Sequence, residues 1–170
     1  MTTEHPFIVE PLGKQHDKSS FSCGVQALDA YLKTQAGQDA KKQVANPFVL
    51  LDTEKNKVAG YYTLSMNAII AQGLPEKITK KLPRYPHLPA VLMGRLAIDD
   101  SYKGQKLGAF LLIDALKRAH AISTSLAATF FVVDAKDEQA KAFYQHFGFV
   151  ALEDDIMRLY LPMKTIGKLP

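Results

Sequence analysis

Short apolar runs and a stretch of helical periodicity alternate in the second half of this chain. Ala90–Ile98 is mostly apolar and is followed directly by two aspartates, which is typical of a strand buried on both faces. Thr129–Val133 is a second run of this kind. Between the runs, apolar residues recur at steps of three and four up to about His120: Leu107, Phe110, Leu111, Ala115, Leu116 and Ala119. This spacing predicts an amphipathic helix, and the order strand, loop, helix, strand predicts a right-handed crossover.

The remaining patterns add further elements. They predict strands at residues 7–12, 47–52, 57–65, 149–151 and 157–161. A helical stretch is expected from Val25 to Gln43, with a break near Gly37. The polar residues 53–56 join two of the strands into a hairpin, and the last two strands should lie next to each other. The sequence therefore predicts an α/β fold built on a mixed sheet.

The loop before the predicted long helix reads Lys103-Gly104-Gln105-Lys106-Leu107-Gly108. A loop that enters a helix exposes the first unpaired N–H groups of that helix, and glycines allow a pyrophosphate to approach the backbone. Taken alone, these residues also fit an ordinary solvated turn. The spacing differs from a Walker loop, and it differs from a dinucleotide fingerprint although Asp134 closes the following strand. A different pyrophosphate ligand is therefore expected.

This loop resembles the acetyl-CoA loop of the GCN5-related N-acetyltransferases (GNAT), which runs Arg/Gln-x-x-Gly-x-Gly/Ala after a central strand. Lys103 stands where the family prefers Arg or Gln, and Lys106 stands at the usual middle glycine. Residues 137–149 resemble a later family segment, in which a helix carries Phe-Tyr and ends at Gly-Phe. Independently, Asp137 suits an N-cap and Gly148 suits a left-handed helix end. The resemblance implies the GNAT acyl-CoA N-acyltransferase fold, a central twisted mixed sheet with helices on both faces.

The resemblance also implies acetyl-CoA as the co-substrate. By this resemblance, the backbone of Leu96, Ala97 and Ile98 holds the pantetheine arm and the thioester carbonyl. The other acetyl-CoA contacts expected are Lys103, Gly104, Gln105, Lys106, Leu107, Gly108, Ala109 and Phe143.

Tyr144 matches the family tyrosine that faces the sulfur of CoA. A phenol with an ordinary pKa of about 10 is protonated at neutral pH, so it is able to donate a proton. Periodicity alone would make Tyr144 one more ring on a buried helical face beside Phe143 and Phe147. No general base is evident, and no catalytic carboxylate is assigned.

More narrowly, the chain resembles the acetyltransferase toxins of bacterial toxin-antitoxin modules over nearly its full length. The segments that carry this resemblance are residues 21–24, 28–32, 36–39, 58–65, 82–86, 94–97 and 158–163. It implies acetylation of the α-amino group of an aminoacyl-tRNA, which blocks peptide-bond formation. A ribbon-helix-helix antitoxin and a homodimer are implied in the same way.

Basic residues are unevenly placed although the formal net charge is only +4. Lys80, Lys81 and Arg84 crowd one connecting segment, and Lys41 and Lys42 lie on the early helical stretch. Solvation alone explains any single lysine, but together with the toxin resemblance we expect these residues to contact RNA phosphates.

Several single residues are further candidates for the site. Arg95 lies on a mostly apolar strand, so it should meet a carboxylate or, preferentially, face the active cleft. Tyr62 and Ser65 suit either an acceptor pocket or sheet packing. Cys23 is expected to be a small buried residue rather than a nucleophile.

Length and composition limit the alternatives. The 170 residues, 47% of them hydrophobic, suit one domain over residues 1–170. No stretch approaches the roughly 20 apolar residues of a membrane helix, and a single cysteine fits a reducing compartment, so a cytoplasmic protein without a membrane partner is expected. No metal is expected, because the histidines have no ligand spacing: His5, His16, His87, His120 and His146.

Two other functions stay open at this stage. One is a GNAT enzyme that acetylates a small amine or a protein N-terminus. The other is a non-catalytic CoA-binding or regulatory module, which would not need Tyr144.

Overall fold

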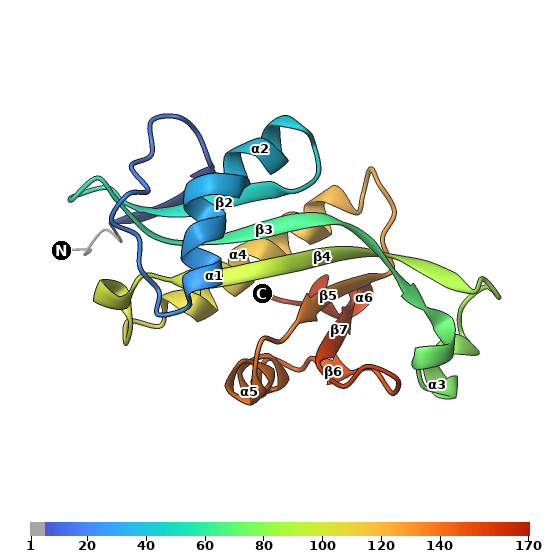
Figure 1. Ribbon diagram of the computed structural model, residues 1–170. Coiled ribbons are helices and arrows are strands. Elements are labelled where there is room, and N and C mark those ends of the chain that lie inside the picture. The colour runs from blue at the N-terminus through green and yellow to red at the C-terminus, as the bar shows by residue number, and fades with distance from the viewer. Residues whose placement is uncertain (1–5) are drawn as a thin grey trace. The chain divides into compact units, whose positions relative to one another are not determined.

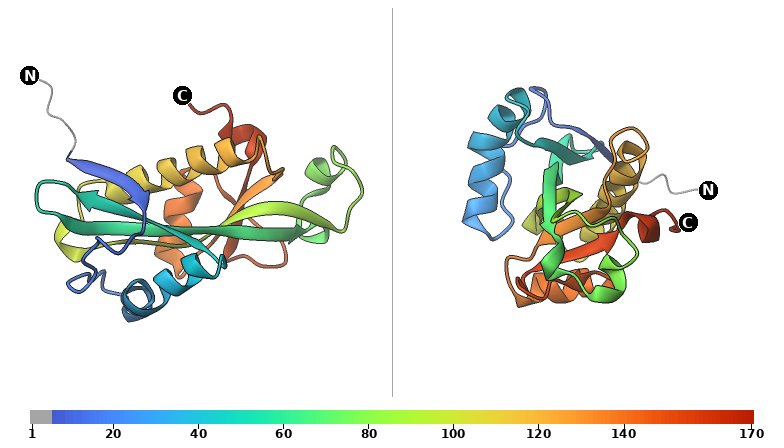
Figure 2. Two further views of the ribbon diagram at one scale, coloured as in Figure 1. Left: turned by 90° about the horizontal axis from the view of Figure 1, so that it is seen from above. Right: turned by 90° about the vertical axis from the view of Figure 1, so that its right-hand side faces the viewer.

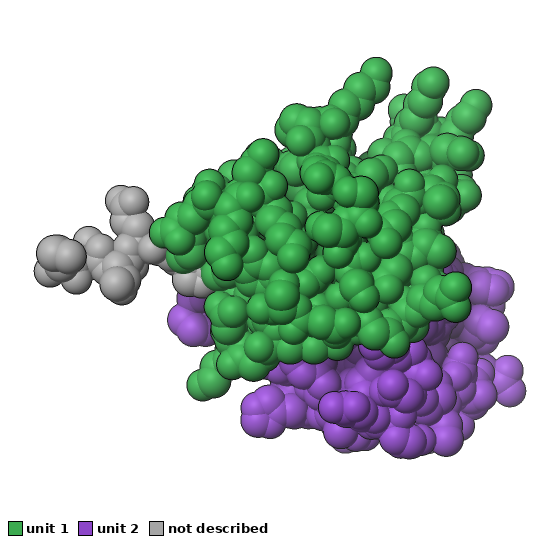
Figure 3. All heavy atoms as spheres, turned by 60° about the vertical axis from the view of Figure 1, so that its left-hand side comes forward, with its two compact units in different colours: residues 1–65, 95–115 green, residues 66–94, 116–170 purple. Residues whose placement is uncertain are grey.

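The computed structural model describes residues 6–170 (Figure 1). Its strands are β1 Phe7–Pro11, β2 Asn46–Asp52, β3 Lys57–Ile70, β4 His87–Ile98, β5 Phe130–Asp134, β6 Val150–Ala151 and β7 Arg158–Pro162. Its α-helices are α1 Gln26–Ala30, α2 Ala36–Lys41, α3 Glu76–Thr79, α4 Leu107–Ile122, α5 Glu138–His146 and α6 Met163–Ile166. The seven strands form one mixed sheet in the order β1-β2-β3-β4-β5-β7-β6, as the GNAT resemblance implies. The chain divides into two compact units (Figure 3).

The first unit comprises residues up to Ser65 and residues 95–115. Its strands β1, β2 and β3 pair antiparallel. Neighbouring residues of β3 point to opposite faces: the Tyr61 hydroxyl donates to the Leu28 carbonyl of the α1 segment, and the Tyr62 hydroxyl donates to Asp114 of α4. Helical segments therefore cover both faces of these strands, as Figure 2 shows.

A β-bulge in this unit brings β3 close to the end of β4. The register of β2 against β3 shifts between Leu50 and Leu51, which leaves Ala59 as the extra residue of β3. The Ala59 carbonyl accepts a hydrogen bond of 2.8 Å from the Asp99 N–H. A Cβ on the next residue, Gly60, would lie 2.8 Å from the Ala97 carbonyl oxygen, so only glycine allows this approach.

The second unit comprises residues 66–94 and 116–170. Here β4 pairs parallel with β5, and β5 pairs antiparallel with β7. Its core gathers apolar side chains from β3, β4, β5, β7 and the segments that follow β3 and β6: Ile69, Leu74, Leu88, Ala90, Phe130, Val132, Leu152 and Tyr160. The Tyr160 hydroxyl is buried there without a hydrogen-bond partner.

Most predicted elements are confirmed, with one correction. The hairpin strand expected at 57–65 continues to Ile70, and its residue Ile69 is buried in the core of the second unit. The break expected near Gly37 is confirmed: a π-helical turn spans Tyr31–Gln35, and α2 begins at Ala36, directly before Gly37. The Tyr31 hydroxyl and the Gln35 side-chain amide of this turn both donate to Asp39. The expectation of a single domain over residues 1–170 stays a prediction.

Candidate active site

The glycine loop connects a short 3₁₀ turn, Asp100–Tyr102, to the 16-residue helix α4. Its exposed residues 103–106 lead into the first turn of that helix, which contains Gly108 and Ala109. Gly104 has a φ of 86° and Lys106 a φ of 61°, so the backbone is left-handed at both positions. Lysine thus adopts the conformation for which glycine is usually chosen. The Cβ of Lys106 therefore does not prevent this turn.

The two lysines of the loop differ in their contacts. The Lys103 ammonium donates to the Cys23 carbonyl at 2.7 Å and forms an ion pair of 2.8 Å with Asp100. It therefore anchors the loop. Within residues 6–170, no hydrogen bond or ion pair engages the Lys106 ammonium, and this side chain is exposed. Lys106 is the better placed of the two to meet an incoming phosphate.

Asp99 fixes the start of the loop. This carboxylate is only 3% exposed and accepts hydrogen bonds from the Ser22 N–H, the Ser101 N–H and the Ser101 hydroxyl. Burial alone would raise the pKa of Asp99, but these hydrogen bonds and Lys57 hold it below the ordinary value. Asp99 is the N-cap of the 3₁₀ turn, since its side chain accepts the Ser101 N–H.

Leu96, Ala97 and Ile98 form the end of β4, where Ala97 is buried and the other two are half-buried. The backbone of Leu96, Ala97 and Ile98 lies beside the bulge of β3, and the hydrogen bond from the Asp99 N–H to the Ala59 carbonyl holds its end in place. Their predicted contact with the pantetheine arm stays a prediction.

Arg95, on the same strand, makes a cation–π contact with Tyr31. Its guanidinium lies 3.5 Å from the centroid of the Tyr31 ring, and Tyr31 in turn stacks on Tyr61. The Tyr31 hydroxyl donates to Asp39 at 2.7 Å. Burial and this hydrogen bond raise the pKa of Tyr31 to about 12, so the ring stays neutral. The sequence predicts that Arg95 meets a carboxylate or faces the active cleft. It does not predict the contact with Tyr31, because Tyr31 lies far away along the chain.

Tyr144 lies on α5 in the second unit. The Asp137 side chain caps this helix by accepting the Ala140 N–H at 2.7 Å, and Gly148 follows it with a φ of 93°, both as predicted. The Tyr144 ring is 6% exposed and packs against Phe143 and Phe149.

The hydroxyl of Tyr144 stays protonated, so it can act as a proton or hydrogen-bond donor. Burial raises its pKa well above the ordinary value, and the negative charge of Asp134 adds to the rise. A phenol with such a pKa keeps its proton at physiological pH, so it is available to donate a hydrogen bond or a proton to a leaving thiolate. Phe143, predicted to contact acetyl-CoA, is half-buried between the Tyr144 and Phe147 rings.

The basic residues predicted to bind RNA lie in different parts of the chain. Lys41 and Lys42 are exposed at the end of α2 in the first unit. Lys80, Lys81 and Arg84 are exposed after α3 in the second unit, where Lys80 and Arg84 line a pocket of about 580 Å³. The sequence did not single out Tyr85, which also lines this pocket. An aromatic residue between basic and proline residues was the available signal.

Other candidates have structural roles. Tyr62 is fully buried, so its alternative of sheet packing is favoured. Cys23 is buried at 5% exposure, as predicted. Within residues 6–170, no three His, Cys, Asp or Glu side chains are grouped as metal ligands would be, and His5 lies outside the described residues. None of the helices formed by residues 6–170 combines the length and apolar character needed to cross a membrane.

Comparison with known proteins identifies the class to which this fold and site belong. Residues 89–165, which include most of β4, the glycine loop, α4 and α5, match the acetyltransferase (GNAT) domain family. A tRNA-acetylating toxin of Mycobacterium tuberculosis is 32% identical over 148 residues, which are 87% of this chain and 87% of that toxin. The chain belongs to the GNAT family of acetyl-CoA-dependent N-acetyltransferases, in the branch of toxins from toxin-antitoxin modules.

Solved structures agree with this assignment. A tyrosine-to-phenylalanine mutant of KacT is 30% identical with a TM-score of 0.92, and the alignment covers 98% of this chain and 100% of KacT. AtaT complexed with acetyl-methionyl-tRNAfMet is 32% identical with a TM-score of 0.88, and the alignment covers 95% of this chain and 97% of AtaT.

Proposed function

We propose that this enzyme transfers the acetyl group of acetyl-CoA to the α-amino group of an aminoacyl-tRNA and thereby blocks the use of that tRNA in translation. The observation that carries the proposal is Tyr144, a buried phenol on a helix whose motif and caps match the family. The relative named as a tRNA-acetylating toxin and the AtaT complex with an acetylated tRNA support the choice of substrate.

Binding of acetyl-CoA is assigned to the first unit. The exposed amides at the start of α4 receive the pyrophosphate, aided by the helix dipole and by the Lys106 ammonium. A structure of AtaTR bound with AcCoA supports this co-substrate. The backbone of Leu96, Ala97 and Ile98 directs the thioester carbonyl and supplies an N–H to the oxygen as negative charge develops on it.

The reaction forms one C–N bond and breaks one C–S bond. The amine nitrogen attacks the thioester carbonyl, and the leaving thiolate takes the proton of the Tyr144 hydroxyl. The amine loses its extra proton to water, which later reprotonates the phenolate. An α-amino group has a reference pKa of about 8, so much of it is neutral near physiological pH and no protein base is required.

Recognition of the tRNA is assigned to the basic side chains. Lys80, Lys81, Arg84, Lys41 and Lys42 are exposed cations that neutralise backbone phosphates with release of counterions. Arg95 presents a guanidinium plane whose face is occupied by Tyr31, which leaves the N–H edges to bind an oxygen of the substrate.

The partners of this enzyme are inferred from the same relatives. AtaT has been solved with the C-terminus of its antitoxin AtaR, which supports an antitoxin partner for this enzyme. We propose that this partner is a ribbon-helix-helix protein, that the enzyme is a homodimer, and that it acts in the cytoplasm, where aminoacyl-tRNA is used.

Replacing Tyr144 by phenylalanine tests the function. The ring contacts with Phe143 and Phe149 remain, so folding and acetyl-CoA affinity should be kept, whereas turnover should fall by roughly 10²-fold or more. The assay follows transfer of radiolabelled acetyl groups to a pool of aminoacyl-tRNAs, with mass spectrometry of the acetylated amino acid.

Tyr160→Phe is the matched control. It removes another buried hydroxyl of the same unit, one that has no hydrogen-bond partner, so turnover should be unchanged. Normal turnover of Tyr144→Phe would exclude the general-acid role. Wild-type activity on small amines or protein N-termini, with none on any aminoacyl-tRNA, would favour the alternative enzyme, and absence of all transfer would favour a non-catalytic module.

A further inference from the structure

A pocket in the second unit contains two of the cations assigned above to the tRNA, Lys80 and Arg84. It lies at the turn between the ends of β3 and β4 and has a volume of about 580 Å³. Its polar and aromatic lining includes Gln72, Lys80, Arg84 and Tyr85, and Glu76 is its only carboxylate. A volume in this range suits a ligand of one or two rings with a substituent.

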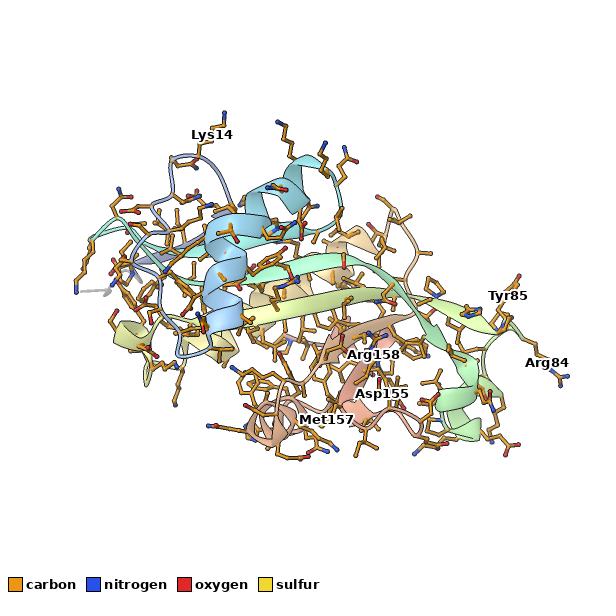
Figure 4. The ribbon with its side chains drawn as sticks, in the orientation of Figure 1. Lys14, Arg84, Tyr85, Asp155, Met157 and Arg158 are labelled. Atoms are coloured by element: carbon orange, nitrogen blue, oxygen red, sulfur yellow. The ribbon has the colours of Figure 1, made fainter. Side chains whose placement is uncertain are left out.

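The ring of Tyr85 is exposed to solvent and is therefore accessible to a ligand. It is 64% exposed, which makes it the most exposed aromatic side chain among residues 6–170. Figure 4 shows Tyr85 and Arg84 extending from the tip of this turn. A tyrosine in this position gains little from packing within the protein, since its ring area stays in water.

The backbone beneath the ring is held firmly. Pro83 and Pro86 flank the Arg84-Tyr85 pair; each proline has a fixed φ of its own, and Pro86 restricts the preceding Tyr85 to extended conformations. The Tyr85 N–H donates to the Pro83 carbonyl at 2.9 Å, and the Pro86 carbonyl accepts the Ala71 N–H at 2.9 Å. The ring is therefore presented on a preorganised turn, which lowers the entropy lost on binding.

An exposed ring beside two cations suits a specific ligand chemistry. A nucleobase stacks on an aromatic face, and its phosphate is neutralised by lysine or arginine. An acidic peptide would use the cations, but only an aromatic side chain within it would stack on the ring. A paired nucleotide would keep its base faces covered by its neighbours, so the base must be unstacked.

We propose that this pocket binds one unpaired nucleotide of the RNA substrate, with its base on the Tyr85 ring and its phosphate on Lys80 and Arg84. The inference rests on the proposed function, because it names the part of that substrate which the enzyme recognises apart from the reacting amine.

The test measures binding and acetylation separately. Binding of a fluorescein-labelled single-stranded RNA tetranucleotide to the full chain is followed by anisotropy over a salt series, without acetyl-CoA. The variants are Tyr85→Ala, Tyr85→Phe and Arg84→Gln. The matched control is Lys14→Gln, which removes an exposed cation of the first unit (Figure 4).

Tyr85→Ala should weaken binding by about 5- to 150-fold, the range for loss of one base stack, while Tyr85→Phe should stay within about twofold. Arg84→Gln should reduce the salt slope by about 0.7, the value for one phosphate of a single strand. Lys14→Gln should change neither. Tyr85→Ala should also lower kcat/KM for aminoacyl-tRNA but not for a small amine.

Three results would overturn the pocket: unchanged tetranucleotide affinity of Tyr85→Ala, equal losses in Tyr85→Ala and Tyr85→Phe, or stronger binding of an acidic tetrapeptide than of the RNA. If the wild type acetylates aminoacyl-tRNA and Tyr85→Ala does so equally well, the pocket is refuted and the function stands. If no aminoacyl-tRNA is acetylated but tetranucleotide binding depends on the Tyr85 ring, the function is refuted and the nucleotide site stands.

Discussion

Lys106 offers a direct test of how the glycine loop accommodates a side chain. Its φ of 61° is nearly the same as the φ of 59° at Gln43, a second left-handed residue of the first unit outside the loop. A left-handed conformation costs an L-residue about 1–2 kcal/mol, and glycine removes this cost. Glycine also returns roughly 0.5–1 kcal/mol of chain entropy to the unfolded state.

The difference between the conformational cost removed and the chain entropy gained by the unfolded state predicts the stability of both glycine variants. Lys106→Gly and Gln43→Gly should each be about 0–1.5 kcal/mol more stable than the wild type, which corresponds to a Tm up to about 3–6 °C higher. Urea unfolding followed by circular dichroism measures the free energy. A loss of more than 1 kcal/mol in Lys106→Gly alone would mean that the lysine side chain stabilises the loop.

The acetyl-CoA affinities of two Lys106 variants distinguish the effect of its charge from the effect of its backbone conformation. An exposed ion pair is typically worth about 0.2–1 kcal/mol, so loss of the Lys106 ammonium in Lys106→Gln should raise the Kd about 1.5- to 5-fold. Lys106→Gly loses the same charge, and the backbone is already left-handed, so its Kd should agree with that of Lys106→Gln within about twofold. Calorimetry that gave Lys106→Gly a tighter affinity than the wild type would refute this reasoning, because the Cβ would then have hindered the ligand.

Three further outcomes are expected. Gly108→Val should raise the Kd for acetyl-CoA about tenfold or more in calorimetry but leave stability nearly unchanged, because valine is at least as good a helix residue as glycine. Unchanged affinity would place the phosphate site elsewhere. Replacing Lys80, Lys81 and Arg84 together by glutamine should raise KM for aminoacyl-tRNA and flatten its salt dependence, with little effect on a small amine; equal losses on both substrates would remove these residues from the RNA site. The folded-state pKa of Asp99 lies below the usual aspartate value of about 3.9, so its contribution to stability is full above that pH and is lost as the pH falls further. Asp99→Asn should therefore be less stable at pH 7 and lose less on acidification, as urea unfolding at several pH values would show.

Local signals in the sequence were sufficient for most elements and for the helix ends. Asp137 and Gly148 cap α5 through contacts within a few residues, so their roles can be read from the neighbouring sequence. The stack of Arg95 on Tyr31 joins two segments that are distant along the chain, and nothing local specifies it.

The bulge and the pocket were missed for a similar reason. The extra residue at Ala59 depends on how β3 registers against β2, which the apolar pattern of either strand alone does not determine. Tyr85 belongs to a pocket only because β3 and β4 bring residues 71–72 and 80–88 together. The identity of the loop, in contrast, came from the family resemblance and not from the spacing of two glycines.

The anchoring of the loop also has a consequence for the time course of folding. Ser22 bonds to Asp99 and Asp100, and Cys23 accepts the bond from Lys103, so partners 77 to 80 residues apart must meet before the loop is complete. Contacts this distant along the chain form slowly, because the loop-closure entropy is lost before the contacts stabilise the structure. A ribosome releases residues 22 and 23 long before residue 103. The newly made enzyme should therefore acquire acetyl-CoA binding late, and a ligand that binds only the native state then stabilises the completed loop.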